Sequence, residues 1–201
     1  AVIMRNLVMG ANFLDSHILH FYHLTLMDFI KGPAMAPWQP SWSADRRFNA
    51  ATTTRLVNNY VKALEMRRKA HEMGAIFGGK LPHPPTYLPG GFTTVPNAAQ
   101  IAKFKTYLTE LIMFIRDVYI EDVEALALKY SDYLRIGQGG KNLLAFGCFD
   151  LDAAGSKKLF KRGRIDNGAA TPSTLDVGQI TEAVRYSWYA DSSAGLNPAA
   201  G

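Results

Sequence analysis

Cysteine is almost absent from this sequence. Cys148 is the one cysteine in 201 residues, so no disulfide can form within the chain and no cage of several cysteines can hold a metal ion. A membrane-spanning helix needs about 18 consecutive apolar residues, and Arg5, Asp15 and Asp28 interrupt the apolar N-terminal stretch. No basic segment followed by an apolar one marks a secretory signal. These absences predict a soluble protein, or part of a soluble subunit.

Apolar side chains, in contrast, are plentiful. They make up 48% of the chain and charged residues 19%, which is typical of a globular protein with a sizeable core. The formal net charge is +5, and the basic residues form one real cluster. Its members are Lys157, Lys158, Lys161, Arg162 and Arg164. Such a cluster can contact nucleic acid or a membrane surface, but we favour a solvated loop or hairpin and expect no nucleic-acid partner.

Hydrophobic periodicity predicts two long helices in the first half of the chain. Residues 6–30 form an almost wholly apolar helix, typical of the interior of a large protein, which ends before Pro33. A second helix begins after a cap at Asn49, or at one of the residues 52–54, and ends near Phe77. Both helices are expected to be largely buried.

The apolar positions of the second helix form two stripes, so we expect burial on more than one side. One stripe follows Leu56, Tyr60 and Leu64 and continues as Arg67, His71 and Gly74. The other follows Ala63, Met66, Ala70, Met73 and Phe77. A basic side chain and an imidazole one turn apart on an apolar stripe are unusual, because both need partners or water if they are buried.

The region after the second helix is predicted to contain a loop and then a third helix. Residues 78–96 are rich in glycine and proline, which predicts a packed loop with a fixed path and no regular structure. A third, amphipathic helix follows Pro96. Its apolar stripe takes a step of five residues between Val118 and Val123, which predicts a kink or break near Ile120.

Short strands replace helices towards the end of the chain. Residues 142–149 form a β-like run, residues 159–167 are predicted to form a hairpin, and the remainder to Gly201 is polar and poorly defined. The fold class is therefore mainly α, with a small β portion after residue 140. We expect one body that is helical over 1–135 and mixed over 136–201, with no independent domain boundary.

Histidines are the first candidates for chemistry. His17 and His20 are three residues apart and share a helix face, whereas His23 lies off that line. A pair with this spacing binds a metal only with further ligands from elsewhere. We favour core histidines that hydrogen-bond to backbone or carboxylate groups, with Asp15 as a nearby acceptor.

Several short patterns lack a residue that their chemistry requires. His71 and Glu72 begin the zinc-protease pattern HExxH, but Ala75 stands where the second histidine is needed. The letters GGK at 78–80 lack the frame of a phosphate-binding loop, because a leucine follows them. The glycines at 137–140 follow a helix rather than a strand, which argues against a dinucleotide site. The cysteine lies in an apolar run, typical of a packed thiol.

Two longer segments resemble the large subunits of nickel-iron hydrogenases. Residues 10–24, GANFLDSHILHFYHL, resemble the family's SHxxHFYHL segment. Residues 69–84, KAHEMGAIFGGKLPHP, with PGGFT at 89–93, resemble its AHExxAxFGGKxPHP and GGxT segments. Shorter likenesses at 139–149 and 186–189 follow in order, so the resemblance covers nearly the whole chain. It points to the periplasmic uptake type, including the nickel-iron-selenium branch.

The resemblance implies a redox enzyme subunit with long buried helices in a hydrogenase large-subunit-like fold. Members of the family oxidise hydrogen to protons and electrons, or catalyse the reverse. Their nickel-iron centre carries carbon monoxide and cyanide on iron and is held by four cysteines, one of them selenocysteine in some members, in RxCGxC and DPCxxC segments. Neither pattern occurs in this chain, and Cys148 matches neither. We therefore expect an internal part of the subunit that holds no metal, is inactive alone, and has those segments beyond both ends.

What this part supplies, by resemblance, is the surroundings of the centre. The residues expected to orient ligands or relay protons are Ser16, His17, His20, Arg67, His71 and His83. His83 is also expected to face the iron-sulfur small subunit, the implied partner, with hydrogen as the substrate. The implied location is periplasmic, with membrane association only indirect.

Two other interpretations stay open. One is a nickel-free relative, like the structural subunits of respiratory complex I, and the other is a helical interaction module whose histidines bind haem or an adventitious metal. The intact HFYH segment and the FGGKxPH-like segment favour the hydrogenase. A stand-alone module is disfavoured because the apolar first helix would expose a large patch.

Overall fold

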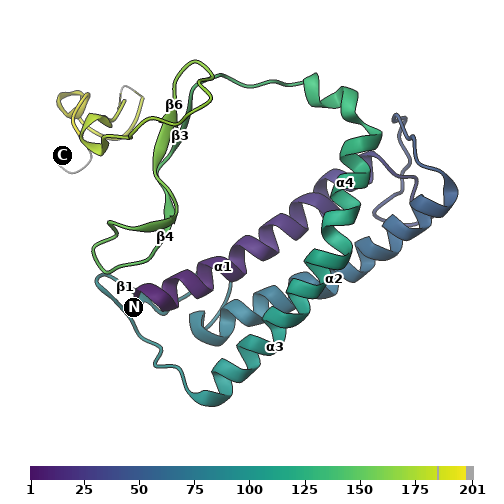
Figure 1. The fold of residues 1–201 in the computed structure, drawn as a ribbon, viewed down its shortest axis with the longest axis horizontal. Coiled ribbons are helices and arrows are strands. Elements are labelled where there is room, and N and C mark those ends of the chain that lie inside the picture. The colour runs from purple at the N-terminus through teal and green to yellow at the C-terminus, as the bar shows by residue number, and fades with distance from the viewer. Residues whose placement is uncertain (185, 198–201) are drawn as a thin grey trace. The chain divides into compact units, whose positions relative to one another are not determined.

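A computed structural model describes residues 1–184 and 186–197 of the chain. They fall into two compact units, a helical one over residues 1–138 and one of short strands and turns from residue 139 onward (Figure 1). The predicted fold class, mainly α with few strands, is confirmed. No helix of the described residues is long and apolar enough to cross a membrane.

The first predicted helix is present but changes its hydrogen-bond period along its length. It begins as the α-helix α1 (Val2–Ile18), continues as the π-helical segment η1 (Leu19–Thr25), and ends as the 3-10 turn η2 (Leu26–Asp28). The predicted start at residue 6 is too late and the predicted end is two residues too long. The π segment was not predicted, because the apolar pattern of this helix is too uniform to show a change of period.

The second helix matches its prediction closely. The helix α2 runs from Ala50 to Gly78, and the side chain of Asn49 caps it by accepting a hydrogen bond from the amide of Thr52 at 2.8 Å. The second predicted stripe is buried along its whole length. The first stripe contained one error, because Leu64 is 49% exposed.

Glycine allows α1 and the following loop to approach α2 closely. A Cβ atom on Gly74 would lie 2.2 Å from Leu81 Cδ1 and 3.3 Å from Ala11 Cβ. The helix ends where Gly79 adopts a φ of 82°, a left-handed conformation that favours glycine. The small residues of the AHEMGAIFGG segment are thus needed for packing.

The glycine- and proline-rich loop has a fixed path, as predicted. Arg5 of α1 donates hydrogen bonds from Nη2 to the carbonyl oxygens of Leu88 and Gly91, each at 2.7 Å. The expectation of no regular structure was wrong on one point. Two very short strands, β1 (Tyr87–Leu88) and β2 (Gly91–Phe92), pair antiparallel there, because the turn between them brings their backbones together.

The third helix has the predicted break. The α-helix α3 (Ala98–Phe114) leads into the π-helical segment η3 (Ile115–Tyr119), which is followed by α4 (Ile120–Lys129) and the 3-10 turn η4 (Ser131–Arg135). A π-helical segment adds one residue to a helical turn. The step of five in the apolar stripe is therefore the sequence signature of this segment.

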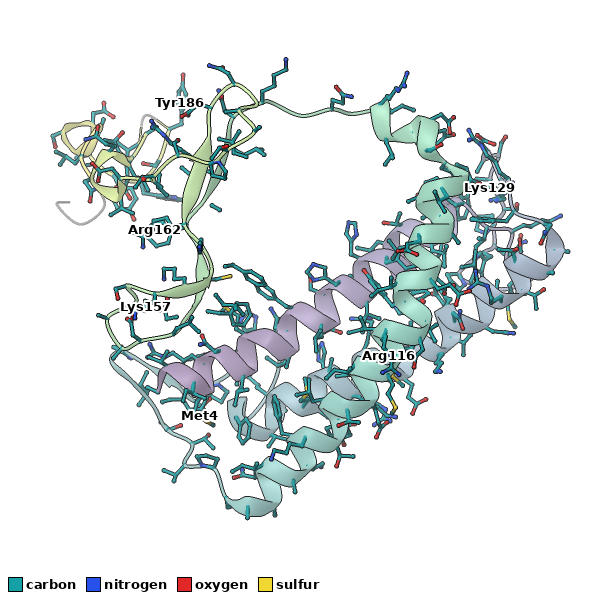
Figure 2. All side chains as sticks on the ribbon, in the orientation of Figure 1. Met4, Arg116, Lys129, Lys157, Arg162 and Tyr186 are labelled. Carbon is teal, nitrogen blue, oxygen red and sulfur yellow. The ribbon has the colours of Figure 1, made fainter. Side chains whose placement is uncertain are left out.

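The second unit contains one interrupted ribbon of two antiparallel strands. Strand β3 (Leu143–Ala145) pairs with β6 (Gly163–Ile165), and β4 (Cys148–Asp150) pairs with β5 (Lys158–Phe160), in one continuous register. The pairing is interrupted in both strands at facing positions, between the pair Ala145–Gly163 and the pair Cys148–Phe160. Figure 2 shows Lys157 at the turn of this ribbon and Arg162 at its break.

The predicted hairpin over residues 159–167 was wrong, because β5 and β6 are consecutive parts of one strand. The turn lies instead between β4 and β5, where the Asp152 carboxylate accepts hydrogen bonds from the amides of Ser156 and Lys157. Two 3-10 turns follow, η5 (Val177–Gln179) and η6 (Asp191–Ser193). Part of the segment expected to be poorly defined lies outside the described residues, at 185 and 198–201.

Candidate functional site: a charged cluster between two helices

The candidate site is centred on Asp15, a carboxylate buried where α1 packs on α2. Only 7% of this residue is exposed, and a buried charge is costly unless it is paired. Each of its two oxygens has a partner. Arg67 donates from Nε to Oδ1 at 2.9 Å, and His71 Nε2 lies 3.0 Å from Oδ2. The carboxylate is therefore fully engaged by two side chains of one neighbouring helix.

Helical spacing explains why both partners reach the same carboxylate. Arg67 and His71 are four residues apart on α2, so they lie one above the other on one face. Their place on an apolar stripe, the anomaly noted in the sequence, is accounted for because that face of α2 meets Asp15 of α1. Sequence reasoning missed this partner. A contact across 52 residues leaves no local signal.

His23 lies near this cluster but serves a different purpose. Its Nε2 donates to the carbonyl oxygen of Tyr60 at 3.2 Å, and the two rings meet edge to face at 4.6 Å. Burial lowers the pKa of His23, and this effect outweighs the hydrogen bond to Tyr60, which raises it; the charge of Arg67 lowers the pKa and that of Asp15 raises it by smaller amounts. The neutral imidazole is favoured, as for a core histidine bonded to the backbone.

The remaining candidates of the first helix do not join the cluster. Ser16, His17 and His20 are all exposed. His17 donates from Nδ1 to the carbonyl oxygen of Phe13, one turn back, at 2.8 Å. His20 lies within the π segment η1. These side chains are available to whatever covers this face of the helix.

The last two named residues lie elsewhere. His83 is exposed in the loop after α2, where it adopts a left-handed φ of 59°. Cys148 is half-buried in β4, opposite Phe160. The structure thus brings Arg67 and His71 together through Asp15, and does not bring in the other four predicted residues.

The described side chains offer no grouped set of metal ligands. Among residues 1–184 and 186–197, no three or more His, Cys, Asp or Glu side chains are grouped so that they could hold a metal ion.

The largest buried polar network elsewhere in the helical unit is centred on Asp122. Its carboxylate accepts hydrogen bonds from Tyr22 and Asn59, each at 2.8 Å, and from Arg55 at 2.6 Å.

The basic cluster of the second unit is exposed except at Lys158, whose side chain is 13% exposed, and it is partly neutralised. Lys158 pairs with Asp150, and Arg164 pairs with Asp166 at 3.2 Å. The guanidinium of Arg162 lies 4.4 Å from the centre of an aromatic ring, that of Phe146. These contacts are consistent with a solvated ribbon.

Comparison with known proteins gives consistent matches. The family model described as nickel-dependent hydrogenase matches residues 1–45 and 31–201. The chain is 38% identical to the periplasmic [NiFeSe] hydrogenase large subunit of Desulfomicrobium baculatum, over 96% of this chain and 39% of that protein. It is 23% identical to the Hydrogenase-2 large chain of Escherichia coli K12, over 96% of this chain and 45% of that protein.

Solved structures agree with the sequence matches. The Ni-Fe-Se hydrogenase from D. vulgaris Hildenborough in the reduced state superposes with a TM-score of 0.89 and 39% identity, covering 100% of this chain and 41% of that one. The [NiFeSe] hydrogenase of Dm. baculatum gives a TM-score of 0.88 and 38% identity, covering 100% and 42%. The chain therefore spans less than half the length of these relatives.

Proposed function

The chain belongs to the nickel-dependent hydrogenase family, and from this membership we propose that it is part of the catalytic large subunit of a nickel-iron hydrogenase. The proposed activity of the complete subunit is the reversible oxidation of molecular hydrogen to protons and electrons. The observation that carries the proposal is the link between the two family segments. Asp15 of the first segment holds Arg67, just before the second segment, and His71 within it.

The residues of this chain do not fit the nickel-iron centre as ligands. The family's centre takes four cysteines, whereas this chain has Cys148 alone, and the described residues offer no other group of metal ligands. We infer that the chain frames the centre and that the centre, with carbon monoxide and cyanide on its iron, is held by other segments of the complete subunit. Infrared bands of those diatomic ligands in the purified enzyme test this assignment.

The framing role follows from how the charged cluster is held. Asp15 holds the guanidinium of Arg67 and the imidazole of His71, so neither side chain can turn away without leaving one oxygen of a buried carboxylate without its partner. Groups fixed in this way orient metal ligands and hold protons near a metal centre without touching the metal. The named relatives are hydrogenases, which favours this proposal over a nickel-free relative.

The test is a substitution at His71 in the complete enzyme. We expect His71→Ala to lower hydrogen-dependent dye reduction by about 10- to 100-fold while nickel content stays close to that of the wild type. Asn58→Ala, which removes an exposed side chain of the same helix α2, is the control and should keep the activity of the wild type. Loss of nickel in His71→Ala would make His71 a structural residue and would contradict the proposed role.

An iron-sulfur small subunit is the proposed partner, with His83 at or near the contact. The support is the exposure of His83 in a loop that Arg5 pins to α1. We expect His83→Glu to reduce co-purification of the small subunit, whereas Lys80→Glu, a second exposed position of the same loop region, measures the effect of charge alone. Equal recovery of the small subunit with His83→Glu would exclude His83 from the interface.

The proposed location is the periplasm, with membrane association only through a partner. The support is the relative from Desulfomicrobium baculatum, which is named a periplasmic hydrogenase. Release of hydrogenase activity by osmotic shock, with a cytoplasmic marker enzyme retained, is the expected result. Activity that stays with the cytoplasmic marker would contradict it.

A further inference from the structure

We propose that Asp15 is a positioning residue that fixes the tautomer of His71, with the proton on Nε2 and a lone pair on Nδ1. The tautomer follows from the geometry alone. Its bearing on turnover rests on the proposed function. The sequence indicates Asp15 as an acceptor for the histidines of its own helix, and the structure pairs it with His71 of α2 instead.

The hydrogen bond between the two residues sets the tautomer. An ionised carboxylate can only accept hydrogen bonds, and Asp15 Oδ2 lies 3.0 Å from His71 Nε2. The imidazole must therefore donate from Nε2. In the neutral ring one nitrogen donates and the other accepts, so Nδ1 keeps its lone pair.

Arg67 occupies one of the two oxygens of Asp15. A guanidinium has donors and no acceptor, so the oxygen that faces Arg67 Nε at 2.9 Å must be an acceptor under all conditions. The other oxygen is then the one left for His71.

As a consequence of this tautomer, Nδ1 has a lone pair that can accept a proton. The His71 side chain is 39% exposed, and no hydrogen bond to its Nδ1 occurs within the described part of the chain. A proton that moves from an O–H or S–H donor to Nδ1 forms an imidazolium, whose charge Asp15 offsets across the ring. Loss of the same proton from Nδ1 restores the starting tautomer.

Asp15→Asn gives a prediction with a definite direction. The amide oxygen of the new side chain must face Arg67, because Arg67 can only donate. The amide NH₂ then faces His71 Nε2, which must become an acceptor. His71 should therefore switch to the form with the proton on Nδ1.

The experiment is 15N NMR of the complete subunit labelled in histidine, recorded at alkaline pH, with the His71 signals identified by their loss in His71→Gln. We expect protonated Nε2 and unprotonated Nδ1 in the wild type, and the reverse in Asp15→Asn. Asp28→Asn, which changes an exposed carboxylate near the end of the same helical stretch, should leave both signals in place.

Two outcomes would overturn the inference. One is a wild-type His71 with its proton on Nδ1, a result that stands even if Asp15→Asn does not fold. The other is a folded Asp15→Asn protein in which His71 keeps its proton on Nε2. A reversed tautomer with unchanged hydrogen turnover supports the positioning role and removes His71 from the proposed hydrogenase mechanism, so the two proposals fail separately.

Discussion

Asp122 is a carboxylate with no solvent exposure, and it joins three parts of the helical unit. It belongs to α4 and accepts hydrogen bonds from Tyr22 in η1 and from Arg55 and Asn59 in α2. Removing one partner of a buried charged network leaves the others unpaired, and this costs more than the loss of an exposed ion pair. The network therefore ties the π segment of the first helix to the helices around it.

We expect Asp122→Ala to lower the free energy of unfolding by about 3 kcal/mol, measured as a fall in melting temperature. Asp117→Ala is the matched control, because the Asp117 side chain is 52% exposed and pairs only with the neighbouring Arg116 among the described ion pairs. Exposed pairs of this kind contribute about 1 kcal/mol or less. Equal losses in the two variants would show that the Asp122 network carries no special stability.

A single imidazole should also make stability depend on pH. Burial lowers the pKa of His23 in the folded protein below its ordinary value of 6.5. The unfolded chain therefore binds more protons between the folded and unfolded pKa values, so stability is highest above pH 6.5 and falls as the pH drops through that window.

His23→Gln is expected to flatten this pH dependence, because an amide can still donate to the Tyr60 carbonyl but does not titrate. The measurement is melting temperature as a function of pH. His20→Gln, at an exposed position of the same π segment, should leave the slope unchanged. A wild-type slope retained in His23→Gln would assign the pH dependence to another group.

Residue patterns predicted part of the site. An arginine and a histidine on an apolar stripe correctly indicated that both needed a partner, and the structure supplies Asp15 for both. The grouping of Ser16, His17 and His20 with them was an expectation from the family segment, and in the described structure these three are exposed. Which helix face meets which neighbour depends on tertiary packing, which periodicity does not encode.

At the scale of elements, the π segment η3 sets the orientation of α4 relative to α3. The extra residue of a π segment rotates everything that follows by about 100° relative to a continuous α-helix. That rotation allows Asp122 and Leu126 of α4 to be buried after Leu111 and Phe114.

Insertion of one alanine after Arg116 lengthens the helix by one residue and is expected to turn the buried face of α4 away from the core. A loss of stability larger than that of Asp122→Ala should follow, because apolar and charged contacts are lost together. Arg116→Ala keeps the chain length and removes a side chain that is 68% exposed, so it should melt near the wild type. An insertion variant as stable as Arg116→Ala would mean that the burial of α4 does not depend on the length of this segment.

Helix caps act at the same scale. Asn49→Ala removes the acceptor for the Thr52 amide and should lower the free energy of unfolding by about 1 kcal/mol. Asn58→Ala, at an exposed position within α2, is the control and should be neutral or slightly stabilising because alanine favours helix. Similar losses in both variants would argue against the cap.

Elements with a strong local signal were predicted well. The cap at Asn49 and the break near Ile120 were both read from the sequence, because a capping side chain and a shifted apolar stripe are local features. The ribbon was not. Its turn was predicted after residue 159 but lies between Leu151 and Lys157, because strand pairing is decided by contacts between distant residues, and several polar and glycine-rich positions offered competing turns.

At the scale of the whole molecule, family membership is the firmest result. Two motif segments identified it, and matches over 96% of the chain confirm it. The sequence pattern changes near residue 136, close to the boundary between the compact units at residues 138 and 139. That both units belong to one large-subunit domain stays a prediction.

The chain expressed alone is expected to bind no nickel in stoichiometric amount and to show no hydrogen-dependent dye reduction. The reason is the donor set of the described residues, in which Cys148 has no grouped partners. Metal analysis after treatment with a chelator is the measurement, with the complete enzyme as the control. Equimolar nickel that survives the chelator would contradict the prediction.

The shared carboxylate also has an evolutionary consequence. Asp15 satisfies Arg67 and His71 at once, so a mutation at any one of the three positions leaves a partner that only a second mutation can rescue. We therefore expect natural selection to act on these three positions together, although they are far apart in the gene. Among descendants of this sequence, we expect them to be retained together or replaced together.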